Sequence, residues 1–426
     1  MSDSGASASR RPRLAFVYHP RSFGTLAIAE AAEGLCELVW IVDTTDPEIG
    51  SMVRLLRRLG EVIDVAGSSI EDAAAAIAAS RPDGILALAD SLLLWTARVA
   101  AALDLLFISP EVAERLTDKY TQRVALQQAG LPVPGFWPIP DRDDDEDAWV
   151  ALERTASFPA VLKPRSGEGS RDVVRVESFP QLRAMVAETP STSGSSSCEL
   201  VLEEYLRDRP EAAGRQFADY VSVESVVSAG QISHLAITGR FPPAEPFRET
   251  GFFIPCAFDT DQCAAIAEVA TAALHGVGVE VGALHTEVKM TPEGPRVIEV
   301  NGRIGGGVPE MLADATGVEL LPIAIRLALG EEIVFDTMPR CAQIGYLLYV
   351  QAPLAMHTIR AVDGLDGLRA RPGVLEVTLN RGPGRSVDWR AGNHGHVFSV
   401  RGSVTDHEML SAIEQHATTE VQIQGD

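Results

Sequence analysis

Two short stretches around a tight turn constrain the fold of this chain more than any other feature. The segments ALHTEVKM (283–290) and RVIEVN (296–301) mix apolar and polar residues as strands do, and they surround Thr291-Pro292-Glu293-Gly294. We therefore predict an antiparallel pair of strands. Residues two apart in a strand face the same way, so polar side chains gather on one face. They are His285, Glu287 and Lys289 on the first strand, and Glu299 and Asn301 on the second.

The register of this hairpin predicts a metal site. If the turn centres near Glu293, position sums across the pair are constant, and Glu287 lies opposite Glu299 while His285 lies opposite Asn301. Two directly opposed carboxylates repel each other unless a cation lies between them. Mg²⁺ takes oxygen ligands from carboxylates and nucleotide phosphates, and an asparagine amide oxygen can complete the set. The alternative is a solvated polar face with the register shifted by one residue.

A glycine-containing loop in AVLKPRSGEGSRDVV (160–174) is a second candidate site. Lys163 ends the predicted strand before the loop, and Val173 begins the predicted strand after it. Glycines let backbone N–H groups approach phosphate oxygens, and a lysine adds a point charge. The GxxxxGK[ST] spacing of a Walker loop is absent. An ordinary hairpin turn is the alternative.

Three further segments are candidate ligand contacts. LVLEEYL (200–206) ends an apolar strand in carboxylates, where backbone groups could bind adenine. FRETGFF (247–253) places Arg248 and Glu249 among aromatic residues, where they could pair with the two ends of an amino acid. Arg303 and the glycines 305–307 follow the hairpin and suit an acyl phosphate or a carboxylate. The alternatives are charged residues at a strand exit, a solvated loop, and a flexible loop before a helix.

The order of predicted elements indicates several domains. LAFVY (14–18), LVWIVD (38–43) and GILALAD (84–90) alternate with helical stretches, which is typical of an α/β, doubly wound parallel domain. We expect this domain to cover residues 1–112. The segment 336–426 reads strand, helix, strand, strand, helix, strand, which suggests a ferredoxin-like α+β domain. Residues 113–335 lie between them, with a small lid at about 155–205.

Composition excludes several classes of protein. The net charge of -23 argues against a nucleic-acid or anionic-membrane surface, because both need a basic footprint. The polar start lacks the apolar stretch of a signal peptide, and charged residues break the apolar region 84–108, so no membrane span is expected. The five cysteines are scattered without CxxC spacing. A reduced, cytoplasmic protein is the expectation.

The order of these motifs resembles the ATP-grasp superfamily. Lys119 on a capped helix comes first, then Lys163 before the glycine loop, EEYL, HTEVKM and IEVNGR. The resemblance covers about residues 1–330. Within the superfamily, HTEVKM…GPRVIEVNGRIGGG and FRETG look most like carboxylate–amine ligases related to bacterial L-amino acid ligases. The implied fold has a parallel N-terminal domain, a lid, an antiparallel-sheet domain for ATP and Mg²⁺, and the C-terminal domain.

The resemblance also implies roles for residues. ATP and Mg²⁺, with Mn²⁺ as a substitute, would be the cofactors, amino acids or other small carboxylates the substrates, and a homodimer the assembly. The implied catalytic residues are Arg303, Glu287 and Glu299, and the implied metal ligands are Glu287, Glu299 and Asn301. The implied ATP contacts are Lys119, Lys163, Ser166, Gly167, Gly169, Ser170, Glu203, Glu204, Tyr205 and Leu206. The implied substrate contacts are Arg248, Glu249, His285, Arg303, Gly305, Gly306 and Gly307.

One position departs from the family pattern. Relatives usually carry an acidic residue for the ribose hydroxyls just before the aromatic residue of an EFSVE-like strand, where this chain has Tyr220. Asp219, one residue earlier, is the substitute we consider.

Three rival interpretations use the same residues differently. The first keeps the fold but makes the chain a ligase or carboxylase of nucleotide or cofactor metabolism. The second is a nucleotide-binding regulator, which would not need the metal set, Glu287, Glu299 and Asn301, together with Arg303. The third, a dinucleotide-dependent oxidoreductase, needs a GxGxxG that the sequence after LAFVY does not contain.

Overall fold

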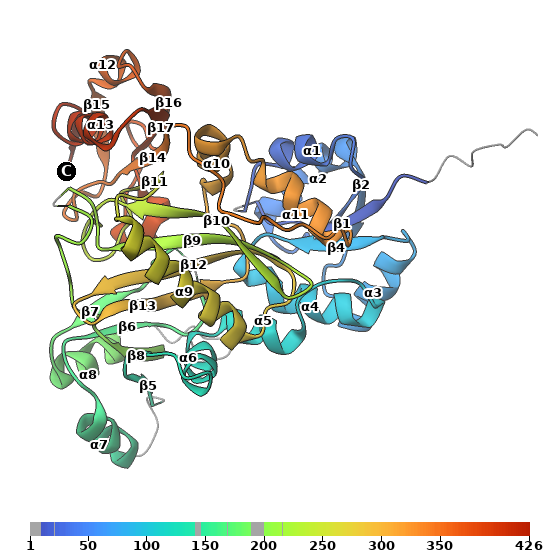
Figure 1. Cartoon of the computed structure of the whole chain (residues 1–426), viewed down its shortest axis with the longest axis horizontal. Helices are drawn as coiled ribbons and strands as arrows, with labels where there is room; N and C mark the ends of the chain where they lie inside the picture. The colour runs from blue at the N-terminus through green and yellow to red at the C-terminus, as the bar shows by residue number, and fades with distance from the viewer. Residues whose placement is uncertain (1–9, 21, 141–145, 168, 189–199, 215) are drawn as a thin grey trace, which may run out of the picture.

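We describe a computed structural model of the chain, which covers residues 10–426 apart from 21, 141–145, 168, 189–199 and 215. Cys198 and Glu168 therefore lie outside the described residues. Figure 1 shows a parallel sheet at one side, a long antiparallel sheet through the middle, a small sheet at the edge and the C-terminal elements beside the long sheet. Among the described residues, no helix combines the length and the apolar character needed to cross a lipid bilayer.

The N-terminal sheet has four parallel strands in the order β3-β2-β1-β4. Its central strands are buried on both faces, which explains their nearly continuous apolar sequences. The elements are β1 (Arg13–Val17), α1 (Thr25–Ala32), β2 (Glu37–Val42), α2 (Pro47–Leu59), β3 (Glu61–Asp64), α3 (Ile70–Ala78), β4 (Gly84–Ala87) and α4 (Asp90–Leu103). The predicted parallel N-terminal sheet is confirmed.

A second, antiparallel sheet of four strands, in the order β5-β8-β6-β7, has its own core around Trp149, Leu162, Leu182 and Leu202. The predicted lid begins at about residue 155, but strand β5 precedes that residue and helix α7, which packs on this sheet, ends at it. The elements here are α5 (Pro110–Thr117), α6 (Lys119–Gln128), β5 (Phe136–Pro138), α7 (Glu146–Thr155), β6 (Ala160–Pro164), β7 (Val174–Val176), α8 (Phe179–Glu188) and β8 (Leu200–Glu204).

The largest sheet has eight antiparallel strands in the order β13-β12-β9-β10-β11-β14-β17-β16. Helix α9 covers it; a capping box between Asp259 and Gln262 begins this helix, and Gly278, with a left-handed φ of 89°, ends it. The elements are β9 (Tyr220–Ser228), β10 (Gln231–Arg240), β11 (Gly251–Ile254), α9 (Thr260–Val277), β12 (Gly282–Thr291), β13 (Gly294–Asn301), α10 (Val308–Thr316), α11 (Leu320–Ala328) and β14 (Ile344–Val350).

The C-terminal elements depart from the expected ferredoxin-like arrangement. A ferredoxin-like fold would place the last strand, β18, beside β14 in one sheet with β17 and β16. Here β14, β17 and β16 are neighbours but continue the large sheet, and β18 pairs with β15. The reason is that β11 already occupies the free edge of β14, where the last strand would pair. The elements are β15 (Ile359–Asp363), α12 (Leu365–Arg369), β16 (Val374–Leu379), the 3-10 segment η1 (Trp389–Gly395), β17 (Phe398–Val404), α13 (His407–Thr419) and β18 (Gln422–Gly425).

Candidate active site

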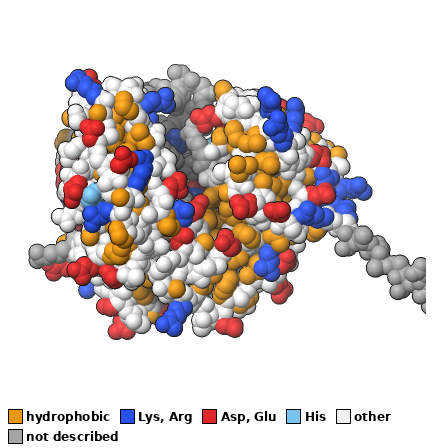
Figure 2. All heavy atoms as spheres, turned by 90° about the horizontal axis from the view of Figure 1, so that it is seen from above, with side chains coloured by type: hydrophobic (Ala, Val, Ile, Leu, Met, Phe, Trp, Pro, Cys, Tyr) orange, Lys and Arg blue, Asp and Glu red, His pale blue; other side chains and the backbone are white. Residues whose placement is uncertain are grey.

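A cavity of roughly 460 Å³ lies where these parts meet. Seen from above, the molecule is hollowed between two lobes, with charged side chains of both signs near the hollow (Figure 2). The lining comes from the carboxyl ends of the N-terminal strands, the small sheet, the large sheet and the C-terminal segment. A cavity of this size suits a small-molecule ligand. Most residues predicted from the sequence as site residues lie around it.

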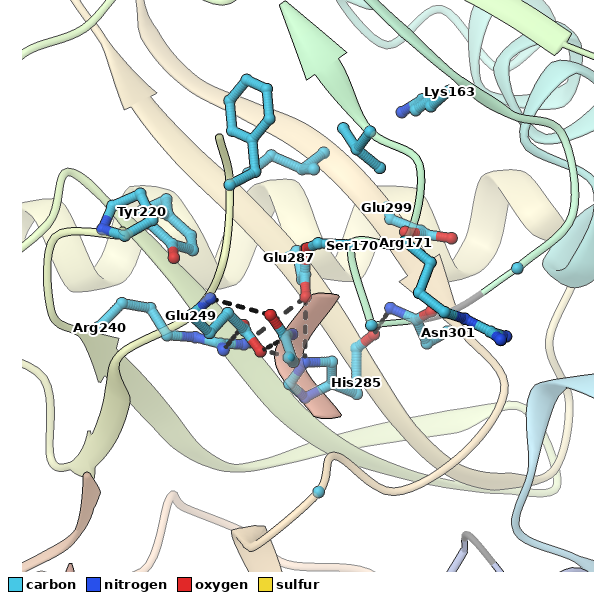
Figure 3. Close-up of a pocket in the computed structure, with 18 of the residues that line it drawn as sticks. Lys163, Ser170, Arg171, Tyr220, Arg240, Glu249, His285, Glu287, Glu299 and Asn301 are labelled. Atoms are coloured by element: carbon cyan, nitrogen blue, oxygen red, sulfur yellow. Dashed lines mark hydrogen bonds and ion pairs between the residues drawn. The ribbon is translucent and has the colours of Figure 1, made fainter. Parts of the chain in front are cut away.

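The hairpin β12–β13 has the predicted pairs. Glu287 lies opposite Glu299 and His285 opposite Asn301. The register shifts after Glu287, because the turn pairs Thr291 with Gly294 and a β-bulge restores the predicted pairs further along. All four paired side chains line the cavity, and Figure 3 shows them around its floor.

This set of side chains fits a magnesium ion. Hydrogen bonding to His285 and the charge of Arg240 outweigh burial and lower the pKa of Glu287 to about 2, so this carboxylate is ionised at neutral pH. Asn301 donates its amide N–H to the His285 carbonyl at 3.3 Å, which fixes the amide beside the carboxylates. Among the described residues, no three His, Cys, Asp or Glu side chains are grouped as metal ligands, so a metal site here would combine the two carboxylates with the Asn301 amide. Two carboxylates and an amide suit Mg²⁺, which usually keeps waters and takes phosphate oxygens as further ligands.

A buried ionic triad fixes Lys163. Glu203 accepts from Lys163 Nζ at 2.9 Å and, through its two oxygens, from the Arg123 guanidinium at 2.9 and 3.1 Å. Although burial opposes ionisation, the two cations lower the pKa of Glu203 to about 2. Burial lowers the pKa of Lys163, against the attraction of Glu203. Glu203 therefore holds Lys163, the lysine that faces the cavity, in place.

Lys119 begins α6 and connects the hairpin to the glycine loop. Its ammonium group lies 3.0 Å from Glu299 and donates to the Gly167 carbonyl at 2.9 Å. Burial alone would lower the pKa of Lys119, but Glu299 raises it, so this side chain stays charged. In the loop, Gly169 has a φ of 68°, a left-handed conformation that favours glycine. Lysines 119 and 163 thus enter the same cavity from different elements.

We expect Lys163→Met to weaken ATP binding about 10- to 100-fold, because one charge-assisted phosphate contact contributes about 1.5–3 kcal/mol. The Glu203–Arg123 pair remains in this variant, so the fold should be retained. Isothermal titration calorimetry measures the affinity. An unchanged affinity would show that the loop after Lys163 is only a turn.

The residues predicted to contact adenine all line the same cavity: Glu203, Glu204, Tyr205 and Leu206. The N–H groups of Glu204 and Tyr205 donate to the carbonyls of Gly135 and Pro159, at 2.7 and 3.2 Å. These bonds join the end of β8 to its neighbouring segments and fix its place at the cavity edge.

The residues considered for the ribose also line the cavity. Asp219 accepts from Lys289 at 2.8 Å and from the Arg209 N–H at 2.6 Å. Asp208 accepts from the same Lys289 at 2.9 Å. Tyr220, where the chain departs from the family pattern, also lines the cavity, and Figure 3 shows it near Arg240.

A second charged network lies across the cavity from the lysines. Arg240, almost fully buried, ends β10 and forms an ion pair with Glu249, with Glu287 3.6 Å away. His285 bridges Glu287, at 3.5 Å, and the buried Glu224, at 2.8 Å. Burial opposes protonation of His285, but Glu224 raises its pKa to about 9. Charged side chains therefore lie on two sides of the cavity, and Glu287 lies between them, opposite Glu299 on one side and near Arg240 and His285 on the other.

Some of the remaining predicted residues line the cavity and others do not. Arg303 lines it, and Asp90 at the start of α4 accepts from its guanidinium at 2.8 Å. Arg248 does not line it: the guanidinium donates to the carbonyls of Glu245, at 2.7 Å, and Ala352, at 2.9 Å. Of the glycine triplet only Gly306 lines it, and of the predicted loop residues Gly167, Gly169 and Ser170 do, whereas Ser166 does not.

Sequence reasoning missed several residues of these networks. Arg123 follows Lys119 by four positions on one helix, a spacing that places both on the same face and could have revealed it. Arg240, a lone arginine that ends an apolar strand, and Glu224 within YVSVES carry weaker signals. Asp90 and Asn393 have no local signal, because their partners lie more than a hundred positions away.

Comparison with known proteins agrees with this geometry. A family model described as an ATP-grasp domain matches residues 156–310. An uncharacterized protein of Sinorhizobium fredii is 28% identical over 349 residues, 81% of this chain and 65% of that protein, so the chain spans less than two thirds of that relative. The alanine–anticapsin ligase of Bacillus subtilis (strain 168) is 25% identical over 353 residues, 72% of this chain and 71% of that enzyme.

Two solved structures share the fold. The L-amino acid ligase from Bacillus licheniformis has a TM-score of 0.77 at 21% identity, covering 98% of this chain and 99% of that one. The biotin carboxylase domain of the Hydrogenobacter thermophilus 2-oxoglutarate carboxylase, solved with MgADP, has a TM-score of 0.66 at 18% identity, covering 97% and 90%. The family match and these superpositions show that the chain contains an ATP-grasp domain and is built on the ATP-grasp fold.

Proposed function

We propose that this protein is an ATP-dependent carboxylate–amine ligase that joins amino-acid-like substrates through an amide bond and releases ADP and phosphate. The observation that carries the proposal is the pairing of Glu287 with Glu299 beside two lysines, in a cavity that also contains a charged network around Arg240. The names of the L-amino acid ligase and the alanine–anticapsin ligase support the same reaction class.

In this proposal the lysines bind the nucleotide. Lys119 and Lys163 neutralise phosphate oxygens of ATP, and Glu203 with Arg123 keeps Lys163 in place. Glu204, Tyr205 and Leu206 contact adenine, and Asp219 is the candidate for the ribose. Glu287, Glu299 and Asn301 would hold Mg²⁺, whose charge would offset that of the phosphates. These fixed charges suit the electrostatic stabilisation on which phosphoryl transfer depends.

The chemistry then takes place in two steps. A substrate carboxylate oxygen attacks the γ-phosphorus, the bond to ADP breaks, and an acyl phosphate forms. The amine attacks the acyl carbon, the phosphate leaves, and the amine loses a proton. Arg303, oriented by Asp90, balances the charge of the acyl phosphate. The acyl phosphate must be kept from water, which would hydrolyse it.

The proposal also covers the metal, the assembly and the location of the protein. Mn²⁺ would substitute for Mg²⁺, since the oxygen ligands suit both ions. A homodimer is proposed because the Hydrogenobacter domain was solved as one. A cytoplasmic location is proposed because Cys36, Cys256, Cys263 and Cys341 are free thiols. The proposed domain limits are 1–112, 113–335 with a lid at about 155–205, and 336–426.

The products of the reaction test this proposal. With ATP, Mg²⁺ and amino-acid pairs screened for phosphate release, we expect ADP and phosphate in step with a dipeptide or similar amide. Hydroxylamine should trap the activated acid as a hydroxamate when the amine is omitted. Arg303→Ala should suppress trapping by about 100-fold, since the acyl phosphate loses its counter-charge.

Chromatography of the nucleotide separates the alternatives. AMP as the product would exclude the ligase mechanism proposed here. ADP formed with bicarbonate and without dependence on an amine would favour a carboxylase and exclude only the amide-forming part.

A further inference from the structure

The C-terminal part of the chain supplies one side of the cavity. Asn393 in η1 and His396 just after it both line the cavity. The Val397 N–H donates to the Val350 carbonyl at 2.8 Å, which ties this segment to the end of β14. A segment anchored to a sheet can hold its side chains in a defined place.

The side chain of Asn393 forms two hydrogen bonds with Glu249. Its side-chain oxygen Oδ1 accepts from the Glu249 N–H at 2.9 Å, and its amide Nδ2 donates to the Glu249 carboxylate oxygen Oε2. Arg240 holds the other carboxylate oxygen, Oε1. An amide offers both a donor and an acceptor, so asparagine satisfies the two contacts that a carboxylate could not. Glu249 therefore presents one fixed orientation to the cavity.

The same residue also touches the loop that follows Lys163. The Asn393 N–H donates to the Gly169 carbonyl at 3.0 Å. Gly392 has a φ of 60°, and a Cβ there would lie 2.2 Å from the Gly169 carbonyl oxygen. Such a close approach of two backbones requires glycine at position 392. One short C-terminal segment thus contacts the nucleotide side and the substrate side of the cavity.

We propose that Asn393 is a positioning residue for the ligase reaction. Its side chain fixes the Glu249 carboxylate for an amino-acid substrate, and its backbone N–H holds Gly169 on the nucleotide side of the cavity. This rests on the proposed function. The side-chain contact sets substrate affinity and the backbone contact, made possible by Gly392, sets ATP affinity. Substitutions at the two positions should therefore change different constants.

Asn393→Asp tests the side-chain contact. This variant removes the amide donor and places a second carboxylate against Glu249, but it keeps the backbone N–H. We expect the KM for one amino-acid substrate to rise about 10-fold or more, while the ATP affinity measured by calorimetry stays within about twofold. Asn393→Ala, which lacks the repulsion, should give a smaller increase in KM. Asn380→Asp is the matched control, because Asn380 is exposed and lies outside the cavity lining.

Gly392→Ala tests the backbone contact and should weaken ATP binding about 10-fold without a comparable change in substrate KM. Equal KM values for Asn393→Asp and Asn380→Asp would overturn the proposal, and so would a joint loss of ATP affinity and thermal stability in Asn393→Asp. Unchanged ATP affinity in Gly392→Ala would show that the backbone contact with Gly169 does not contribute to ATP binding. Calorimetry with ATP needs no ligation, so this arm stays decisive even if the wild-type protein forms no amide and the proposed function fails.

Discussion

Glu299→Gln is expected to lower the turnover of the ligase reaction by about 100-fold or more while leaving the fold intact. The Glu299 carboxylate lies opposite Glu287 and 3.0 Å from the ammonium group of Lys119. Glutamine keeps the shape of the side chain but removes the charge that both a Mg²⁺ ion and Lys119 require. Turnover measured across a magnesium titration, with circular dichroism to verify the fold, checks this expectation.

Glu293→Gln provides the control on the same hairpin. Glu293 lies at the turn, forms an ion pair with Arg207 and is outside the cavity lining. The same chemical change at this position should leave turnover nearly unchanged. Turnover of Glu299→Gln close to that of the wild-type protein at limiting Mg²⁺ would contradict the assignment of the hairpin as the metal site.

Glu203→Gln is expected to destabilise the protein by about 3–5 kcal/mol, since it leaves Arg123 and Lys163 buried without their shared counter-charge. Urea unfolding measured at pH 7 should therefore show a clearly lower midpoint. Glu204→Gln is the matched control one residue later, at a side chain that is exposed. The double variant Glu203→Gln/Lys163→Met should recover part of the loss, because it removes one of the two cations.

The same carboxylate predicts a pH dependence. The pKa of Glu203 is about 2 in the folded protein, below the value of about 4.3 expected for an unfolded chain. A lowered pKa contributes stability above the unfolded value, and this contribution is lost as the pH falls from about 4 toward 2. The gap between wild type and Glu203→Gln should therefore narrow below pH 4. Equal midpoints at pH 7 would show that the triad does not stabilise the fold.

The hairpin register shows how far local sequence reasoning extends. The pairs Glu287–Glu299 and His285–Asn301 were predicted from a turn centred at Glu293, and the structure confirms them. The turn itself centres between Pro292 and Glu293, not at Glu293 as predicted. The β-bulge that compensates for this difference has no clear signal in the local sequence. The bulge leaves Ile298 unpaired, and the carbonyl of this residue accepts a hydrogen bond from Arg123 of a distant helix.

The C-terminal region shows the opposite limit. Its predicted strands and helices are present, and β15 is a further strand that was not predicted. The ferredoxin-like arrangement was wrong, because β18 pairs with β15 and not with β14. Element type follows from local periodicity and turns, whereas pairing depends on which sheet edges other parts of the chain leave open. Here β11, more than ninety positions before β14, occupies the decisive edge.

Lys119 followed from the resemblance to the ATP-grasp superfamily. The sequence by itself determined the parallel N-terminal sheet, the metal-binding hairpin as a hypothesis, and Lys163 before the glycine loop. These features depend on strand periodicity, helix capping and the spacing of charged residues, which are local along the chain. Only the tertiary structure decided that Glu203 holds Lys163, that Glu249 rather than Arg248 faces the cavity, and that Asn393 reaches both Glu249 and Gly169. The physical reason is that a buried charge must find partners wherever the folded chain brings them, and those partners come from distant segments.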